Sequence, residues 1–329
     1  MRRRLVALLA GSVVLLPLAP LVRAAPAPAA EKWALVIGIN DYAGRTVDTI
    51  GSVGDAQDVT KALRDNGWPA DHIITLLDGE ATAAKIRAGM RFLVEKSSPT
   101  SFSVFHYSGH TKQFDGVPDA EGADEYLWSA LNEFISDNEF THEMRAVRGR
   151  LWANVSNCES AGFDDGFSGP EKLFTAASME DEKGYEEPAW NRSVFTGLMV
   201  SEGILKGSGD ANGDKRVSLD EAFAYAEKIA PQMTANEKPY GAQHPYRAGG
   251  GGEWFLSAPP PAEVPDLPAP VRDLPVVRDL PVDDLLRALP VPDPPPGTPE
   301  PPPLPIPEQP IGTPQPPPPP PLPEGLPRL

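Results

Sequence analysis

Short apolar runs alternate with segments of helical spacing between residues 32 and 230 of the chain. A short apolar run bounded by polar or turn residues is typical of a strand, whereas apolar residues three and four positions apart indicate one face of a helix. The apolar runs predict strands at residues 33–39, 72–77, 102–107, 150–155 and 172–177. The helical spacing predicts helices at residues 55–66, 82–95, 193–205 and 219–229.

The order of these elements predicts the fold class. Strands that alternate with helices indicate an α/β fold, with a mainly parallel sheet and helices on both of its faces. Residues 33–39 (WALVIGI) are nearly all apolar, as expected of a strand that is covered on both faces. A last strand is predicted at residues 253–256, after a glycine-rich turn at residues 249–252. In such sheets, ligands bind beyond the carboxyl ends of the strands.

The N-terminal residues have the pattern of a secretory signal peptide. Residues 2–4 are all arginine, residues 5–21 are largely apolar, and small residues follow up to Ala24. This order of charge, apolar core and small residues predicts cleavage after Ala24 and an exported protein, either secreted or held in the cell envelope. A later cut near Ala29 and an uncleaved membrane anchor are the alternatives. Residues 25–31 would then be a short linker to a domain at residues 32–257.

Residues 258–329 contain most of the 41 prolines of the chain. Proline fixes φ and removes the backbone donor, so this tail is expected to be extended or disordered rather than part of a sheet. It would act as a spacer within a cell envelope, or as a ligand for a proline-binding partner. It contains no apolar run long enough to cross a bilayer, so no stable membrane span is expected after signal cleavage.

Charge and cysteine content narrow the classes of partner. The formal net charge is −17, and loss of the four arginines before residue 25 would lower it to −21. A chain this acidic is a poor candidate for nucleic-acid binding, and peptide or protein substrates are the expected partners. One cysteine cannot form an internal disulfide, so Cys158 is either an inert buried thiol or a functional one.

Two of the predicted strands stop at a reactive side chain. His110 follows the strand at residues 102–107, and Cys158 follows the strand at residues 150–155. A thiol needs a nearby base to become a good nucleophile, and neighbouring strand ends supply such a pair. The sequence therefore predicts a catalytic dyad of these two residues. The alternatives are a structural role for either residue, or His106 as the base.

Several motifs around these residues give the chain a family resemblance. These motifs are the segments WALVIGINDY from Trp33, Gly54-Asp55-Ala56, Tyr107-Ser108-Gly109-His110, Asn157-Cys158-Glu159-Ser160, Leu173-Phe174-Thr175-Ala176-Ala177-Ser178 and Ser193-Val194-Phe195-Thr196. With these segments, the chain resembles the caspase-like cysteine peptidases of the metacaspase and bacterial caspase-domain group.

The resemblance implies a caspase-like fold and a cysteine endopeptidase that needs no cofactor for catalysis. Cys158 would attack a peptide carbonyl with the help of His110 and form an acyl-enzyme. The backbone amide of Cys158 and one near Gly109 or Thr111 would stabilise the oxyanion. A catalytically silent caspase-fold protein, which binds partners through its acidic cleft or its proline-rich tail, is the alternative function.

The chain departs from the family at two positions near the predicted site. Thr111 stands where the family usually has glycine, and Ser156 stands where metacaspases have an aspartate that helps to bind a basic P1 side chain. Asp55 matches the other acidic residue of that S1 pocket. The resemblance thus favours arginine or lysine at P1, with asparagine as the alternative. The acid-rich residues 180–187 are expected to form an exposed loop, with processing or substrate specificity as alternative roles.

Residues 210–221 have the pattern of an EF-hand calcium loop. Oxygen-bearing side chains stand at the ligand positions of such a loop, and Lys215 replaces the usual glycine at its sixth position. The pattern predicts a structural Ca²⁺ ion, with an acidic loop that caps a helix as the alternative. The expected ligands are Asp210, Asn212, Asp214, the carbonyl of Arg216, Ser218 and Glu221.

Overall fold

The computed structural model of the chain describes residues 30–115 and 123–257. The predicted signal peptide and the proline-rich tail lie outside these residues, as does nearly all of the predicted linker. Within the two described ranges, no helix is both long enough and apolar enough to cross a membrane.

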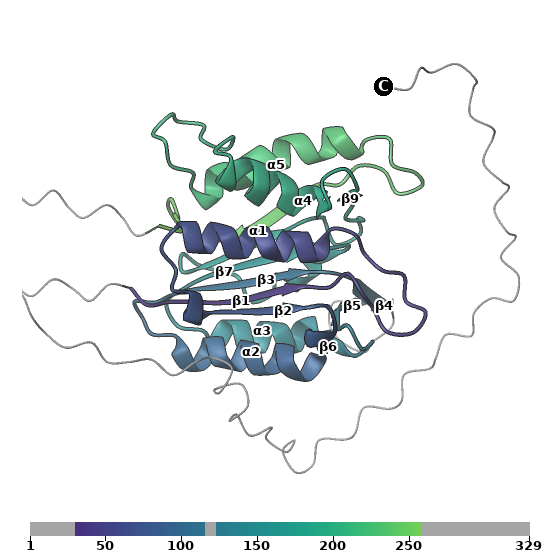
Figure 1. Cartoon of the computed structure of the whole chain (residues 1–329), viewed down its shortest axis with the longest axis horizontal. Coiled ribbons are helices and arrows are strands. Elements are labelled where there is room, and N and C mark those ends of the chain that lie inside the picture. Colours follow the sequence, from purple (N-terminus) through teal and green to yellow (C-terminus); the bar gives the residue numbers. More distant parts are fainter. Residues whose placement is uncertain (1–29, 116–122, 258–329) are drawn as a thin grey trace, which may run out of the picture. The chain divides into compact units, whose positions relative to one another are not determined.

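A six-stranded sheet forms the centre of the fold (Figure 1), with the strand order β11-β8-β7-β3-β1-β2. All neighbouring pairs are parallel except β11 with β8, which is antiparallel. The mainly parallel α/β sheet that the sequence predicted is therefore confirmed. The strands are β1 (Lys32–Gly38), β2 (Ile73–Leu77), β3 (Phe102–Ser108), β7 (Arg150–Ser156), β8 (Lys172–Ala176) and β11 (Tyr246–Gly249).

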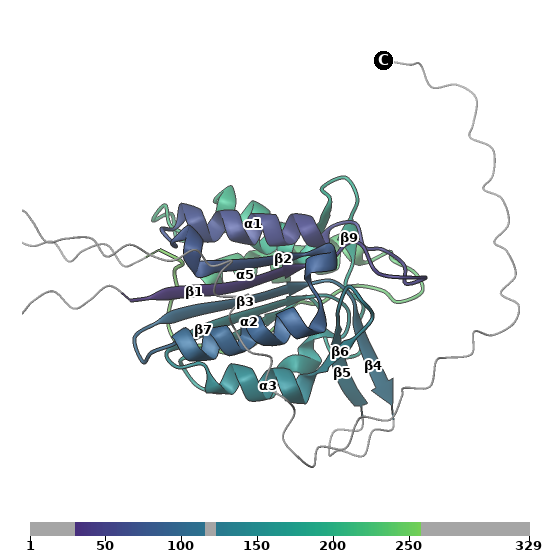
Figure 2. The ribbon, with the colours of Figure 1, turned by 60° about the horizontal axis from the view of Figure 1, so that its bottom comes forward.

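Helices cover both faces of this sheet, as Figures 1 and 2 show from two directions. On one face lie α1 (Ser52–Asp65), α4 (Val194–Thr196), the π-helix η4 (Gly197–Leu205) and α5 (Leu219–Thr234), and on the other lie α2 (Ala83–Lys96) and α3 (Asp137–Ala146). Each face buries its own apolar cluster, because side chains alternate between the two faces along every strand. Short 3₁₀ turns complete the set: η1 (Ala70–His72), η2 (Asp78–Glu80) and η3 (Ser160–Phe163).

Local signals in the sequence explain where two of the helices begin. Thr82 caps α2, because its side chain accepts a hydrogen bond from the amide of Lys85. Ser218 caps α5 in a reciprocal capping box with Glu221. Both helix starts are fixed by a side chain that satisfies a backbone donor of the first turn.

Three features differ from the sequence prediction. Residues 253–256 form no strand, and the last strand is instead β11, which adds to the edge of the sheet beside β8. The predicted helix at residues 193–205 is a short α-helix that continues as a π-helix. The sequence also gave no indication of α3, of the three-stranded sheet β4 (Thr111–Asp115), β5 (Ala123–Trp128) and β6 (Phe134–Ser136), or of the pair β9 (Glu186–Glu187) and β10 (Arg192–Ser193).

The centre of the sheet decides where the chemistry lies. β3 and β7 are adjacent and parallel, and Ser108 is the register partner of Ser156 at their carboxyl ends. His110 and Cys158 each follow two residues later. Two neighbouring parallel strands therefore bring both residues to the same edge of the sheet.

Candidate active site

His110 and Cys158 line one cavity at the carboxyl edge of the sheet, with a volume of about 100 Å³. The sequence predicted both residues, and the structure brings them together there. Gly109 and Ser156 line it too, whereas Asp55 and Thr111 do not. The complete lining is Thr49, Ser52, Ser108, Gly109, His110, Ser156, Asn157, Cys158, Ala177, Gly184, Tyr185, Glu186 and Ser193.

The ring of His110 is held in one orientation. Its Nε2 donates a hydrogen bond to the carbonyl oxygen of Val47 at 2.7 Å. The ring packs against Tyr42 and Trp128, with centroid distances of 4.8 Å and 5.7 Å. In the neutral ring this contact places the proton on Nε2 and leaves Nδ1 as the acceptor, which is the tautomer that a general base requires.

Two tyrosines fix the backbone around His110. Its amide donates to the hydroxyl of Tyr42 at 2.6 Å, and its carbonyl accepts from the hydroxyl of Tyr107 at 2.6 Å. A Cβ atom at Gly109 would lie only 2.6 Å from the Tyr42 hydroxyl oxygen and 3.0 Å from that of Tyr107. The glycine is therefore required, since any side chain would displace the hydroxyls that hold the turn.

Cys158 is half-buried, and a segment of the chain lies over it. Its Sγ is 3.8 Å from the carbonyl oxygen of Gly184, and the backbone amide of Glu159 donates a hydrogen bond of 2.8 Å to the backbone carbonyl oxygen of Glu182. Burial raises the pKa of the Cys158 thiol above its ordinary value. The thiol therefore needs a base to become a thiolate near neutral pH.

Residues 180–187 do not form a simply exposed loop, so that expectation was wrong for part of the segment. Lys183 forms an ion pair with Glu159, the residue after the cysteine. A Cβ atom at Gly184 would lie 2.5 Å from the carbonyl oxygen of Asn157. The close approach of backbone to backbone requires glycine here, and it ties this segment to the cysteine turn.

Thr111 connects the histidine turn to the cysteine turn. Its hydroxyl donates a hydrogen bond of 2.6 Å to the carbonyl oxygen of Cys158. A glycine at this position has no hydroxyl, so the departure from the family adds a contact. The contact fixes the Cys158 carbonyl relative to β4, which begins at Thr111.

We expect Thr111→Val to lower kcat about tenfold, because it leaves a partly buried carbonyl beside the cysteine without its donor. KM should stay unchanged, since Thr111 does not line the cavity. Thr111→Ser keeps the hydroxyl and is the matched control, with near wild-type kcat. Steady-state kinetics on one peptide substrate checks this. Equal loss of kcat in the Val and Ser variants would argue against a role for the hydroxyl.

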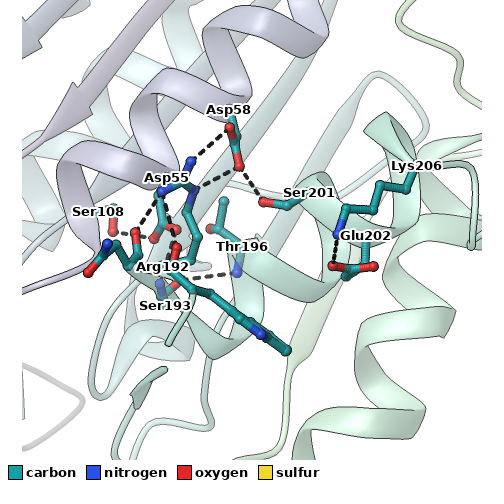
Figure 3. A network of polar contacts seen from close by, with 11 residues as sticks. Asp55, Asp58, Ser108, Arg192, Ser193, Thr196, Ser201, Glu202 and Lys206 are labelled. Carbon is teal, nitrogen blue, oxygen red and sulfur yellow. Dashed lines mark hydrogen bonds and ion pairs between the residues drawn. The ribbon is translucent and has the colours of Figure 1, made fainter. Parts of the chain in front are cut away.

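The two predicted S1 residues lie at different depths. Ser156 lines the cavity, and its hydroxyl is 2.7 Å from that of Ser193. Asp55 is fully buried beneath it, where it accepts hydrogen bonds from the hydroxyl of Ser108 (2.8 Å) and the amide of Ser193 (3.0 Å). Figure 3 shows these contacts, with Arg192 beside them.

Burial gives Asp55 an unusual protonation behaviour. Burial raises the pKa of its carboxyl to about 7, although the hydrogen bonds from Ser193 and Ser108 and the charge of Arg192 act in the opposite direction. Arg192 itself is held in a two-pronged contact with Asp58, at 2.7 Å and 3.1 Å. Asp55 therefore changes charge close to neutral pH, directly below the cavity.

The alternative base, His106, lies away from the cavity. It is fully buried, and its Nδ1 contacts the side-chain amide of Asn154 at 2.9 Å. Burial lowers the pKa of His106 to about 3, so it stays neutral. It belongs to the interior of the sheet rather than to the surface that a substrate reaches.

Sequence reasoning did not single out several residues that shape the site. Tyr107 lies three residues before His110, which was the available signal, whereas Tyr42 ends the first quoted motif and only the fold brings it to the histidine turn. The carbonyl of Val47 carries no side-chain signal. Glu186 was one acid in an acidic run, and the pairing of β9 with β10 and contacts with the amides of Ile50 and Gly51 place it at the cavity.

The predicted calcium loop has the turn of an EF-hand but no evident metal site. Lys215 adopts a φ of 68°, the left-handed conformation for which this position normally has glycine. Asp210 accepts a hydrogen bond from the amide of Lys215 at 2.9 Å, and Glu221 accepts one from the amide of Ser218 at 2.9 Å. These oxygens thus accept hydrogen bonds from backbone amides of the loop and of the start of α5.

The other predicted ligands behave in the same way. Asn212 accepts from the amide of Asp214, and Asp214 accepts from that of Arg216, both at 2.8 Å. Across residues 30–115 and 123–257, no group of three or more His, Cys, Asp or Glu side chains is placed to hold a metal ion. The structure therefore does not support the calcium prediction, and a loop that caps a helix accounts for these contacts.

The cysteine and the histidine beside one cavity, at the carboxyl edge of a mainly parallel sheet, form the arrangement of an α/β thiol hydrolase. Residues 31–192 match the family model of the caspase domain of peptidase family C14. This part of the chain therefore belongs to the caspase-like cysteine peptidase family, which confirms the family that the motifs indicated.

Curated relatives agree with this assignment. Metacaspase-1 of Candida albicans is 34% identical over 155 residues, which are 41% of this chain and 34% of that protein. Metacaspase-3 of Arabidopsis thaliana is 35% identical over 112 residues, which are 31% of this chain and 30% of that protein. The chain thus spans about a third of the length of the curated relatives it matches.

A solved structure supports the fold alone. The crystal structure of a protein from Geobacter sulfurreducens matches with a TM-score of 0.52 and 15% identity, and the match covers 70% of this chain and 98% of that one.

Proposed function

We propose that this protein is an exported caspase-like cysteine endopeptidase with Cys158 as the nucleophile and His110 as its base. The observation that carries the proposal is that both side chains line one cavity, while the carbonyl of Val47 holds His110 with Nδ1 as the acceptor. Export rests on the signal-peptide pattern of residues 1–24.

The proposed reaction runs in two stages. Nδ1 of His110 takes the thiol proton of Cys158, and the thiolate attacks the substrate carbonyl to form a C–S bond. The peptide C–N bond then breaks, and the amine leaves with the proton from His110. Water, activated by the same histidine, breaks the C–S bond and releases the acid and the free thiol.

The oxyanion of each tetrahedral intermediate needs backbone donors. The candidates are the amide of Cys158 and one from Gly109 or Thr111, which lie on the two turns that flank the cavity. The hydrogen bond from Thr111 to the Cys158 carbonyl joins these two turns directly.

Arginine or lysine at P1 is the preference that we propose. The support is negative charge at the cavity: Glu186 in its wall and Asp55 below it. Neighbouring hydroxyls of Ser156 and Ser193 offer acceptors for further hydrogen bonds from a guanidinium or ammonium group.

The charge of Asp55 gives this preference a pH signature. Since the pKa of Asp55 is raised to about 7, the carboxyl is neutral below that pH and negative above it. We expect the ratio of kcat/KM for an arginine over a glutamine P1 substrate to rise from about pH 6 to about pH 8. The ratio cancels the titration of the dyad, which acts on both substrates.

Asp55→Asn is the matching variant, because it removes the charge while it keeps the shape. Its ratio should stay flat over the same pH range, as measured by initial rates on the two substrates. An equal rise in the wild type and the variant would show that Asp55 does not influence P1 selection. The raised pKa of Asp55 also affects the stability of the fold. As pH rises towards about 7, the folded chain still binds a proton at Asp55 that the unfolded chain has already released, so the free energy of unfolding falls.

A catalytically silent caspase-fold protein is the second candidate. The observations that favour it are Ser156 and Thr111 at positions where the family has other residues, and the segment around Gly184 that lies over the thiol. A silent protein would bind partners through its acidic cleft or its proline-rich tail.

Cleavage of a diverse peptide library by the purified full-length protein separates the two candidates. A peptidase cuts a consistent set of bonds with a shared P1 residue, and Cys158→Ala does not. A silent protein cuts none, and its thiol reacts with iodoacetamide no faster than an ordinary cysteine at the same pH.

A further inference from the structure

The wall of the cavity holds one carboxylate that the family resemblance does not provide. Among the described residues that line the cavity, Glu186 is the only aspartate or glutamate, and His110 is the only basic residue. The metacaspase aspartate is replaced by Ser156, whose hydroxyl contacts that of Ser193. The carboxylate in the wall of this cavity therefore comes from a different strand than the motif implies.

Glu186 lies across the cavity edge from the position of the missing aspartate. In the β9–β10 pair, Glu186 is the register partner of Ser193. Ser193 in turn contacts Ser156 at 2.7 Å through the two hydroxyls. Ser193 thus lies between Ser156, at the end of β7, and the carboxylate-bearing Glu186 on β9.

The carboxylate of Glu186 is held in place by two backbone amides. Its Oε1 accepts hydrogen bonds from the amides of Ile50 (2.8 Å) and Gly51 (2.5 Å), directly before the start of α1. Among the described residues, the one donor to its Oε2 is the Ile50 amide, at 3.0 Å, which Oε2 shares with Oε1. A carboxylate oxygen accepts two hydrogen bonds, so Oε2 retains capacity for a donor from a ligand in the cavity.

The other nearby acids are engaged elsewhere. Asp55 is fully buried, and Ser108 and Ser193 occupy its oxygens from the cavity side. Glu187 is next in sequence, but its Oε1 accepts from the amide of Ala189 in the following turn. Neither residue lines the cavity.

We propose that Glu186 selects a basic P1 side chain in this cavity, in place of the aspartate that metacaspases have at the position of Ser156; this rests on the proposed peptidase function. A guanidinium or ammonium group in the cavity forms a charge-assisted hydrogen bond with Oε2 of Glu186. The amides of Ile50 and Gly51 fix the position of that carboxylate before the substrate arrives.

The test compares arginine and glutamine P1 substrates of otherwise identical sequence. We expect the wild type to prefer arginine, and Glu186→Gln to lower the arginine-to-glutamine ratio of kcat/KM about thirtyfold. The glutamine carbonyl can still accept from the Ile50 and Gly51 amides. Glu187→Gln removes one negative charge at the neighbouring position and is the matched control, with an unchanged ratio.

A second variant separates the loss of the charge from any other effect of the Glu186→Gln substitution. Ser156→Asp in the wild-type background returns the family aspartate, and we expect it to raise the arginine preference. In the double variant Glu186→Gln/Ser156→Asp, the aspartate should restore most of the lost ratio.

Three outcomes would overturn the inference. An unchanged ratio in Glu186→Gln would show that another group selects P1, although the peptidase function would stand. A wild type that prefers glutamine or asparagine at P1 would also show that Glu186 does not select a basic side chain, and the peptidase function would again stand. A wild type that cleaves no substrate of either kind would overturn the proposed function and this inference together.

Discussion

Replacement of Cys158 by alanine is expected to lower peptide hydrolysis on the order of 10⁴-fold, to the limit of detection. The reason is chemical, because no other cysteine exists in the chain to form the acyl-enzyme. The hydroxyls around the cavity do not replace the thiol, because an alcohol ionises far less readily than a thiol and is a much weaker nucleophile near neutral pH. Initial rates on the best peptide from the library measure this effect.

The loss must come from chemistry rather than from unfolding. Cys158 is half-buried, so its removal should cost only about 1 kcal/mol of the free energy of unfolding. We expect the Cys158→Ala protein to have a circular dichroism spectrum like that of the wild type. Hydrolysis at more than a few per cent of the wild-type rate, after removal of contaminating proteases, would contradict the assignment of the nucleophile.

Replacement of His110 by glutamine should lower kcat/KM on the order of 10³-fold. Burial raises the pKa of the Cys158 thiol, so without a base only a small fraction is thiolate near neutral pH. Glutamine can still donate to the carbonyl of Val47, but it cannot accept the thiol proton. Alkylation of Cys158 by iodoacetamide at neutral pH should slow in parallel, which a structural role for the histidine would not produce.

His142 offers the matched control for this variant. It is exposed on α3, and His142→Gln is expected to leave both hydrolysis and alkylation unchanged. If the two glutamine variants behave alike, His110 is not the base. If His110→Gln lowers hydrolysis but leaves alkylation unchanged, then His110 acts only after the thiolate has formed.

The sequence predicted the elements that carry the dyad because they lie in the middle of the sheet. β3 and β7 are covered on both faces, so their apolar runs stand out, and their parallel pairing brings their ends together. The element order alone then placed His110 and Cys158 at one edge.

The elements outside the central sheet gave much weaker signals. β4 (TKQFD) and β5 (ADEYLW) each carry two charged residues and lack a continuous apolar run, as a hairpin beyond the sheet edge does. Helix α3 buries only Asp137, Phe140, Thr141 and Met144, so its apolar face is narrow. Periodicity predicted a helix at residues 193–205, but the π-helical backbone of η4 has no signature in a single sequence.

The pocket was less predictable than the dyad for a related reason. Asp55 is in the expected motif, yet its depth below the cavity depends on Ser108 and Ser193, which come from two other segments of the chain. Glu186 reaches the cavity through contacts with backbone amides at residues 50 and 51. Contacts between distant segments of this kind leave no local pattern in the sequence.

Covalent labelling at the active site tests the central claim, that Cys158 and His110 act as a pair on peptide substrates. The full-length protein is treated with peptidyl acyloxymethyl ketones that carry arginine, asparagine or glutamine at P1, and the adducts are mapped by mass spectrometry. The account predicts one adduct per chain, on Cys158, that forms fastest with arginine and far more slowly in His110→Gln. No adduct with any of the three probes, or labelling at the same rate in the wild type and in His110→Gln, would contradict it.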